Sequence, residues 1–251
     1  MQTIAIVNHK GGTGKTTTTV NLAVALAQNN LSVIAIDLDP QGSLSYYLQA
    51  VQPYTISEAL TGEVPLTKIV VNREGVDILP ANQRLADIEL AMVNIPQREY
   101  LIKQLFERII GYDFLLVDCS PSLSLLTVNA LTAVKKVIIP MQLEVLSLQG
   151  LSLILDTVFG IKEQLNPNLQ ILGILPVMLD KRKKVTSEIL EYLKTNIGLP
   201  LFSPIHTDVK AIEAPSFGKS ILSYAPSSIS AQDYRRVAQE LLQSCEYHNN
   251  S

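Results

Sequence analysis

Cysteine and histidine are scarce in this sequence, and tryptophan is absent. The 251 residues include two cysteines, Cys119 and Cys245, with no paired Cys-x-x-Cys motif. This argues against a disulfide framework and indicates a reducing, cytoplasmic setting. The three histidines, His9, His206 and His248, are far apart in the sequence. They lack the spacing of metal ligands, so no transition-metal site is expected.

Long apolar runs are also missing. No stretch approaches the roughly 20 uninterrupted apolar residues that a membrane-spanning helix needs. The N-terminus lacks the basic segment and apolar stretch of a signal peptide, and neither internal repeats nor low-complexity tracts occur. Hydrophobic residues make up 47% of the chain and charged residues 17%, a globular composition. A chain of this length can bury a substantial core, and one domain over residues 1–251 is the simplest expectation.

The chain has no general excess of basic charge, since its formal net charge is −3. This argues against a uniformly basic nucleic-acid binder. Residues 1–180 hold 11 basic and 16 acidic side chains, whereas residues 181–251 hold 9 and 7. Any basic surface is therefore expected in the C-terminal part.

Short apolar runs alternate with longer helical patterns along the chain. The runs are rich in Val and Ile and mostly continuous, as in parallel strands covered on both faces; they span 3–7, 32–37, 76–79, 114–118, 136–140 and 169–177. Helical patterns span 15–29, 83–92, 97–110, 122–134, 147–165, 184–195 and 230–245. This alternation predicts an α/β fold, a doubly wound and mainly parallel sheet with helices on both faces. Residues 50–75 are expected to form a small helix and loops.

A glycine-rich loop follows the first predicted strand. Residues 3–27 place a buried strand, a glycine-rich turn and a helix in the order that phosphate binding requires. The standard pattern asks for a glycine where this chain has His9, but three glycines remain to bring the backbone close to a phosphate. Lys15 is expected on the β- and γ-phosphates, and the hydroxyl of Thr16 on Mg²⁺. The predicted nucleotide-binding loop comprises Lys10, Gly11, Gly12, Thr13, Gly14, Lys15, Thr16 and Thr17.

Lys10 is a second lysine on this loop and allows two interpretations. It is either a solvated residue at the edge of the loop, or it projects toward another molecule. If two such loops faced each other, each Lys10 would neutralise charge on the phosphoryl group bound by the opposite subunit, as an arginine finger does.

Aspartates stand at the ends of two predicted strands. Asp37 follows VIAI and Asp118 follows FLLV. In an open parallel sheet, ligands bind outside the carboxyl ends of the strands, so both are expected to face the loop. Asp118 is expected near Mg²⁺, and Asp39 could orient the attacking water or accept its proton. The alternative for an aspartate after a strand is a turn or a helix cap.

Three motifs together resemble the ParA/MinD group of deviant Walker A ATPases, and most closely its ParA/Soj branch. They are KGGTGKTT (10–17), DLDPQG (37–42) and DCSPSL (118–123). The likeness covers nearly the whole chain, because further stretches also read like that branch; these are 128–151, 169–180, 213–221 and 230–242.

The resemblance implies an ATP- and Mg²⁺-dependent ATPase whose two ATP-bound subunits pack face to face. It implies that Lys10 crosses to the partner's nucleotide, that Lys15 acts on the phosphates, and that Asp39 is needed for hydrolysis. The implied metal-side residues are Thr16, Asp37 and Asp118, and those of the base pocket are Met178, Pro204 and Asp208. The chain departs from the family at His206-Thr207-Asp208, where relatives often read Pro-Arg-Asn, so that an arginine is missing.

Family members of this branch bind DNA without sequence preference and are reset by a ParB-like partner. The resemblance thus implies a homodimer on ATP binding, a cytoplasmic, nucleoid-associated location, and an activating ParB-like or cargo-adaptor protein. The basic candidates for DNA contact are Lys181, Arg182, Lys183, Lys184, Lys210, Lys219, Arg235 and Arg236. Alternatively, these side chains are simply solvated. In that case the protein is an ATP-dependent regulatory or scaffolding switch that binds a protein partner but not DNA.

Two other branches fit the sequence less well. A MinD-like membrane protein ends in a basic amphipathic helix, whereas this sequence ends in ELLQSCEYHNNS without a basic residue. A nitrogenase iron-protein type needs cysteines that hold an iron–sulfur cluster between subunits, and Cys119 and Cys245 do not offer that spacing. No membrane role and no cluster are therefore expected.

Overall fold

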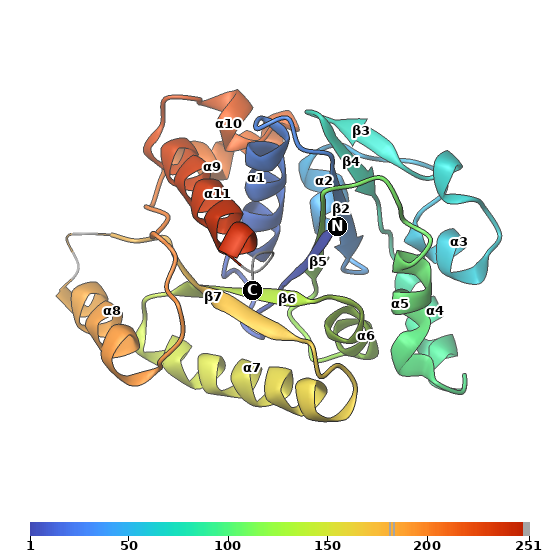
Figure 1. Ribbon diagram of the computed structural model, residues 1–251. Helices are drawn as coiled ribbons and strands as arrows, with labels where there is room; N and C mark the ends of the chain where they lie inside the picture. The colour runs from blue at the N-terminus through green and yellow to red at the C-terminus, as the bar shows by residue number, and fades with distance from the viewer. Residues whose placement is uncertain (181, 183, 248–251) are drawn as a thin grey trace.

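The computed structural model describes residues 1–180, 182 and 184–247, apart from the side chains at 184, 246 and 247. Its centre is a seven-stranded sheet in the order β3-β4-β2-β5-β1-β6-β7 (Figure 1). The strands are β1 (Gln2–Ile6), β2 (Val33–Leu38), β3 (Val71–Arg73), β4 (Val76–Leu79), β5 (Phe114–Cys119), β6 (Lys136–Gln142) and β7 (Gln170–Val177). Neighbouring strands run parallel except for β3 and β4.

Helices cover both faces of the sheet, so the predicted fold class is confirmed (Figure 1). One face packs against α1 (Lys15–Ala27), α2 (Ser43–Tyr47), α10 (Ile221–Tyr224) and α11 (Ile229–Tyr247). The other packs against α3 (Ile56–Thr61), α4 (Arg84–Met92), α5 (Leu101–Phe106), α6 (Leu125–Ala133), α7 (Val145–Gln164) and α8 (Lys184–Asn196). A further short helix, α9 (Val209–Glu213), follows the loop after β7 and α8. The sheet thus separates two hydrophobic cores, which is why its central strands are apolar without alternation.

All six predicted strands are present, and the one that was not predicted lies at the sheet edge. β3 has three residues, two of them the polar Asn72 and Arg73, so it carries no apolar run. It pairs with β4 in an antiparallel hairpin whose turn, Glu74 and Gly75, has positive φ at both residues. The pairing to β4 makes this segment a strand, because its own side chains carry little preference for one.

The helix predictions are right in position and less accurate in extent. The pattern over 97–110 forms a 3₁₀ turn (Arg98–Tyr100) followed by α5, which ends at Phe106. In the segment 50–75, the small helix is α3, whose start is fixed by a capping box between Thr55 and Glu58. A 3₁₀ turn (Leu66–Lys68) and the start of the hairpin follow. The short helices α2, α9 and α10 were not predicted, because four or five residues are too few to show a helical period.

The parallel register brings the ends of β1, β2 and β5 to one edge of the sheet. Asp37 on β2 lies opposite Asp118 on β5, and Ile6 at the end of β1 lies opposite Asp118 on the other side. The glycine-rich loop leaves β1 at this point and leads into α1. Strand pairing therefore places both aspartates beside the loop, as the sequence predicts.

Helix α7 is, within the described ranges, the one helix with the length and hydropathy of a membrane span. One side of it carries Leu151, Ile154, Val158 and Ile161, which are buried in the core beneath the sheet. A helix that covers a sheet needs such an apolar side. This packing accounts for one side of α7, whereas Val145, Leu146, Leu153 and Phe159 on the same helix are exposed.

Gly42 offers a test of the turn that follows β2. Its φ is +64°, and a Cβ atom there would lie 2.9 Å from the carbonyl oxygen of Ala81. We expect Gly42→Ala to lower the free energy of unfolding by about 1–3 kcal/mol, through the strained backbone and this contact. The matched control is Gly150→Ala within α7, where φ is not positive and no atom lies within 4 Å. It should be neutral or stabilising by about 0.5–1 kcal/mol. Urea denaturation of both variants measures the difference, and equal stabilities would contradict this account.

Candidate nucleotide-binding site

The loop between β1 and α1 has the backbone of an anion-binding cradle. Gly12 and Gly14 have φ of 72° and 74°, a region that favours glycine. Gly14 precedes α1 directly, and no side chain caps this helix end. The first N–H groups of a helix have no acceptor within the helix, and its dipole adds positive potential there. The loop is therefore suited to hold phosphate oxygens.

Lys15 folds back over this loop. Its amino group donates a hydrogen bond to the carbonyl oxygen of Lys10 at 3.2 Å, and the residue is 7% exposed. Burial lowers the pKa of Lys15, and the nearby charge of Asp118 opposes that shift. A largely desolvated cation attracts phosphate more strongly than a solvated one.

Asp118 is joined to the start of α1 by hydroxyl groups. The Thr16 hydroxyl donates to Asp118 Oδ2 at 2.7 Å, and that of Thr19 donates to Oδ1 at 3.4 Å. Burial, together with the charge of Asp37, raises the pKa of Asp118 well above its usual range. A cation beside the carboxylate would favour its ionised form.

Asp37 is completely buried and holds the turn after β2. Its Oδ2 accepts bonds from the backbone N–H and the hydroxyl of Ser45 at 2.8 and 2.7 Å, and Oδ1 accepts one from the Asp39 N–H at 3.2 Å. Burial raises the pKa of Asp37 to about 6, although the Ser45 bonds oppose the shift. Asp37 thereby sets the position of Asp39, which is partly exposed.

This set of donors fits Mg²⁺ held together with a nucleotide. No group of three or more His, Cys, Asp or Glu side chains that could enclose a metal occurs among the described residues. Mg²⁺ in nucleotide sites takes few protein ligands and completes its octahedral shell with phosphate oxygens and water. The Thr16 hydroxyl with Asp118 behind it matches that arrangement.

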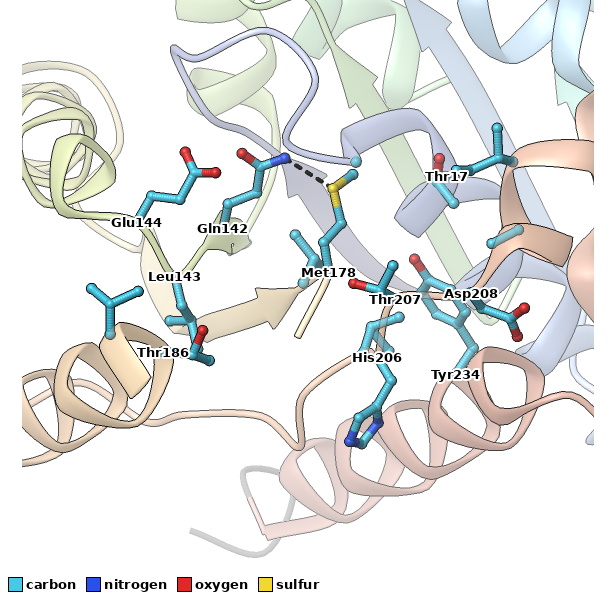
Figure 2. Close-up of a pocket in the computed structure, with 16 residues that line it drawn as sticks. Thr17, Gln142, Leu143, Glu144, Met178, Thr186, His206, Thr207, Asp208 and Tyr234 are labelled. Carbon is cyan, nitrogen blue, oxygen red and sulfur yellow. Dashed lines mark hydrogen bonds between the residues drawn. The ribbon is translucent and has the colours of Figure 1, made fainter. Parts of the chain in front are cut away.

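A pocket of about 330 Å³ adjoins the loop on the side of β7 and α11 (Figure 2). Its lining residues come from distant segments; they include Gly14, Thr17, Gln142, Glu144, Met178, Thr186, His206, Thr207, Asp208 and Tyr234. Met178 and Asp208, predicted for the base pocket, line it, whereas Pro204 does not. Met178 has a φ of 55°, unusual for a large side chain and typical of ligand sites.

The stretch that departs from the expected Pro-Arg-Asn is anchored from α11. His206 Nδ1 lies 2.8 Å from Asp233 Oδ2, which also accepts the His206 backbone N–H. Asp208 caps α9 by accepting the Lys210 N–H and also accepts the Ser230 hydroxyl. The Nδ1 of His206 and the Asp208 carboxylate are thus bonded within the subunit, whereas His206 Nε2 is buried without a hydrogen-bond partner among the described residues.

Comparisons with known proteins agree with this geometry. Residues 1–171 match the family model of an AAA domain. The chain is 40% identical to the chromosome-partitioning ATPase Soj of Thermus thermophilus, over 95% of this chain and 94% of that protein. It is 36% identical to the chromosome partitioning protein ParA of Caulobacter vibrioides, over 96% and 94%. The chain belongs to the ParA/Soj family of partition ATPases.

One solved structure with a similar fold contains a bound nucleotide. It is a protein of Mycobacterium smegmatis described as cobyrinic acid a,c-diamide synthase, with a bound ATP analogue and magnesium. It is 33% identical, covers 97% of this chain and 94% of its own, and superposes with a TM-score of 0.87. A fold of this kind therefore accommodates an adenine nucleotide with magnesium.

Lys10, the second lysine expected in a ParA/Soj loop, points to its own subunit. Its amino group lies 2.8 Å from Glu144 Oε2 and 3.3 Å from Gln142 Oε1. Gln142 and Glu144 were not predicted as site residues. Their one signal in the sequence is their place at the carboxyl end of a predicted strand.

His9, at the position of the missing glycine, ties the loop to α7. Its Nε2 lies 3.3 Å from the Thr157 hydroxyl. Burial lowers the pKa of His9, and the charge of Lys15 lowers it further, so the ring is neutral near pH 7. His9 anchors the loop from outside the phosphate cradle.

The basic residues predicted for DNA are only partly available in the ParA/Soj chain. Arg182 pairs with Asp180 at 2.9 Å, Lys210 with Glu213 at 3.1 Å, and Arg236 with Asp233 at 3.5 Å. Arg235 donates to the carbonyl oxygen of Pro226. Lys219 is exposed, between η3 (Ala214–Phe217) and α10. Lys181, Lys183 and the side chain of Lys184 lie outside the described residues.

Lys15→Ala tests the assignment of the loop. We expect the binding free energy of MgATP to weaken by about 1.5–3 kcal/mol or more, because a charged hydrogen-bond donor is lost. This corresponds to a loss of affinity of roughly 10- to 150-fold or more. Lys162→Ala, an exposed lysine on α7, is the control and should bind normally. Titration calorimetry measures both, and normal binding by Lys15→Ala would refute the assignment.

Proposed function

We propose that this protein is a Mg²⁺-dependent ATPase that cycles between a monomer and an ATP-sandwich dimer. The dimer binds DNA without sequence preference, and a ParB-like or cargo-adaptor protein resets it by stimulating hydrolysis. The observation that carries the proposal is one loop with two lysines beside buried carboxylates at the ends of β2 and β5. Membership of the ParA/Soj family supports it.

Each side chain has a defined task in this proposal. Lys15 and the N–H groups of the loop bind the β- and γ-phosphates. Thr16, backed by Asp118, contacts Mg²⁺, which neutralises charge on the phosphates. Asp39 orients the attacking water and accepts its proton, while Asp37 fixes the backbone that carries it. Lys10 crosses to the partner's nucleotide and stabilises the negative charge of the transferred phosphoryl group.

DNA binding would come from the surface around α9, α10 and α11. These elements are adjacent (Figure 1); α9 carries Lys210, α11 carries Arg235 and Arg236, and Lys219 lies in the loop just before α10. A dimer doubles this surface, so a subunit with a net charge of −3 can still bind phosphates once paired. The cargo is plasmid DNA, a chromosome or a protein compartment such as a carboxysome, at the nucleoid in the cytoplasm.

One observation favours a second candidate function. Arg182, Lys210 and Arg236 each have a carboxylate partner in their own subunit. Pairing of this kind reduces the charge that DNA would meet. A regulatory or scaffolding switch that binds ATP and a protein partner, but not DNA, is consistent with that surface.

Two variants test the catalytic assignments. Asp39→Ala should keep ATP binding and the dimer while turnover falls by about 10²-fold or more, since the water loses its orienting group.

Lys10→Gln should bind ATP within about twofold of the unmodified protein and hydrolyse it more slowly, because the charge acts in the opposite site. Phosphate release gives turnover, and a fluorescent ATP analogue gives affinity. Unchanged hydrolysis in Asp39→Ala would contradict the catalytic role of Asp39. Equal loss of ATP binding and turnover in Lys10→Gln would show that Lys10 acts within its own subunit.

DNA retention separates the two candidate functions. The protein with Asp39→Ala, held as the ATP dimer, is passed over immobilised duplex DNA of arbitrary sequence at low salt. Retention should require ATP and Mg²⁺ and fall steeply as salt rises. Lys219→Glu should weaken retention without changing the dimer, whereas Lys162→Glu on α7 should not. Absence of ATP-dependent retention by a protein that does dimerise would support the switch instead.

A further inference from the structure

The resting contacts of Lys10 bear on its role in the proposed reaction. Its amino group forms an ion pair with Glu144 at 2.8 Å and a hydrogen bond with Gln142 at 3.3 Å. Both partners lie at the carboxyl end of β6. Gln142 is 132 positions and Glu144 is 134 positions after Lys10 in the chain. The lysine that is expected to act on a second subunit is therefore bonded within its own.

Gln142 links this lysine to the rest of the site. Its Nε2 donates to the carbonyl oxygen of Gly12 at 3.2 Å and contacts Met178 Sδ at 2.9 Å (Figure 2). One amide thus joins Lys10, the backbone of the phosphate loop and Met178. Figure 2 shows Gln142 and Glu144 side by side at one wall of the pocket, with Met178 next to Gln142.

We propose that Gln142 and Glu144 are positioning residues that hold Lys10 in its own subunit and so restrain the ATP dimer. Two of the three N–H donors of Lys10 are directed at Gln142 and Glu144, so turning the amino group toward a phosphate of the opposite subunit would break these contacts. Because Gln142, Glu144 and Met178 line the pocket, a nucleoside that enters it meets the side chains that hold Lys10. The pocket thereby couples nucleotide occupancy to release of the lysine. This inference rests on the proposed function, in which Lys10 acts across a dimer.

The expected size of the effect follows from exposure. The side chains of Lys10 and Glu144 are 40% and 54% exposed, so solvent screens the pair. Exposed ion pairs contribute little, and their removal changes an equilibrium by about two- to fivefold. A restraint of that size biases the dimer equilibrium without preventing dimerisation.

Glu144→Gln removes the charge of the pair and keeps the size of the side chain. We expect ATP-dependent dimerisation, measured by analytical ultracentrifugation, to become about two- to fivefold more favourable. Gln142→Glu places a second carboxylate beside the amino group and should make dimerisation less favourable. The thermal unfolding midpoint without nucleotide should stay close to that of the unmodified protein in both variants, which shows that the fold is intact. Glu163→Gln, at the exposed far end of α7, removes the same charge and should leave dimerisation unchanged.

A double-mutant cycle with Lys10→Gln separates positioning from a merely structural effect. If Glu144 acts through Lys10, Glu144→Gln should have no further effect on dimerisation in the Lys10→Gln background. An effect that persists there, or a Glu144→Gln single variant that dimerises no better than the unmodified protein, would overturn the inference. Failure of the unmodified protein to dimerise with ATP and Mg²⁺ would instead contradict the proposed function.

Discussion

The hydrogen bond between the Thr16 hydroxyl and the Asp118 carboxylate, at 2.7 Å, is the contact on which the rest of the site depends. It joins the first turn of α1 to the end of β5, and so fixes the phosphate loop against the sheet. The register of β1 with β5 makes it possible, because Ile6 and Asp118 lie opposite each other where the loop begins. A shift of one residue would turn Asp118 to the other face of the sheet.

The same region concentrates charge that the protein alone does not balance. Asp37 and Asp118 lie opposite each other on neighbouring strands, and burial raises the pKa of both. Lys15 is the buried cation beside them, with its pKa lowered by the same burial. Ionising both carboxylates here is unfavourable in the protein alone, and a Mg²⁺ ion beside Asp118 would favour the ionised forms. The site is thus arranged for a ligand that carries a divalent cation, because the cation would stabilise the ionised carboxylates.

The strand–loop–helix unit can be read from local spacing, whereas Gln142 and Glu144, which tertiary contacts bring to the loop, were not predicted. Gly12, Gly14, Lys15 and Thr16 lie within one strand–loop–helix unit, so their spacing alone indicated a phosphate loop. Asp118 was singled out because an acidic residue directly follows the apolar run FLLV, which marks the end of a strand. Met178 and Asp208 were placed by resemblance, and both line the pocket, but Pro204 does not. β3 escaped prediction because its three residues become a strand through pairing with β4.

By itself, the sequence determined the α/β class, the order of its main strands and helices, and the loop with two lysines and nearby carboxylates. These features follow from periodicity, turn chemistry and short spacings, which are local properties of the chain. The tertiary structure decided where Lys10 rests, which groups wall the pocket, and which basic side chains are already paired. Gln142 and Glu144 reach Lys10 only because β6 lies beside β1 in the sheet. Contacts over such separations depend on the order and register of the strands, which no local pattern encodes.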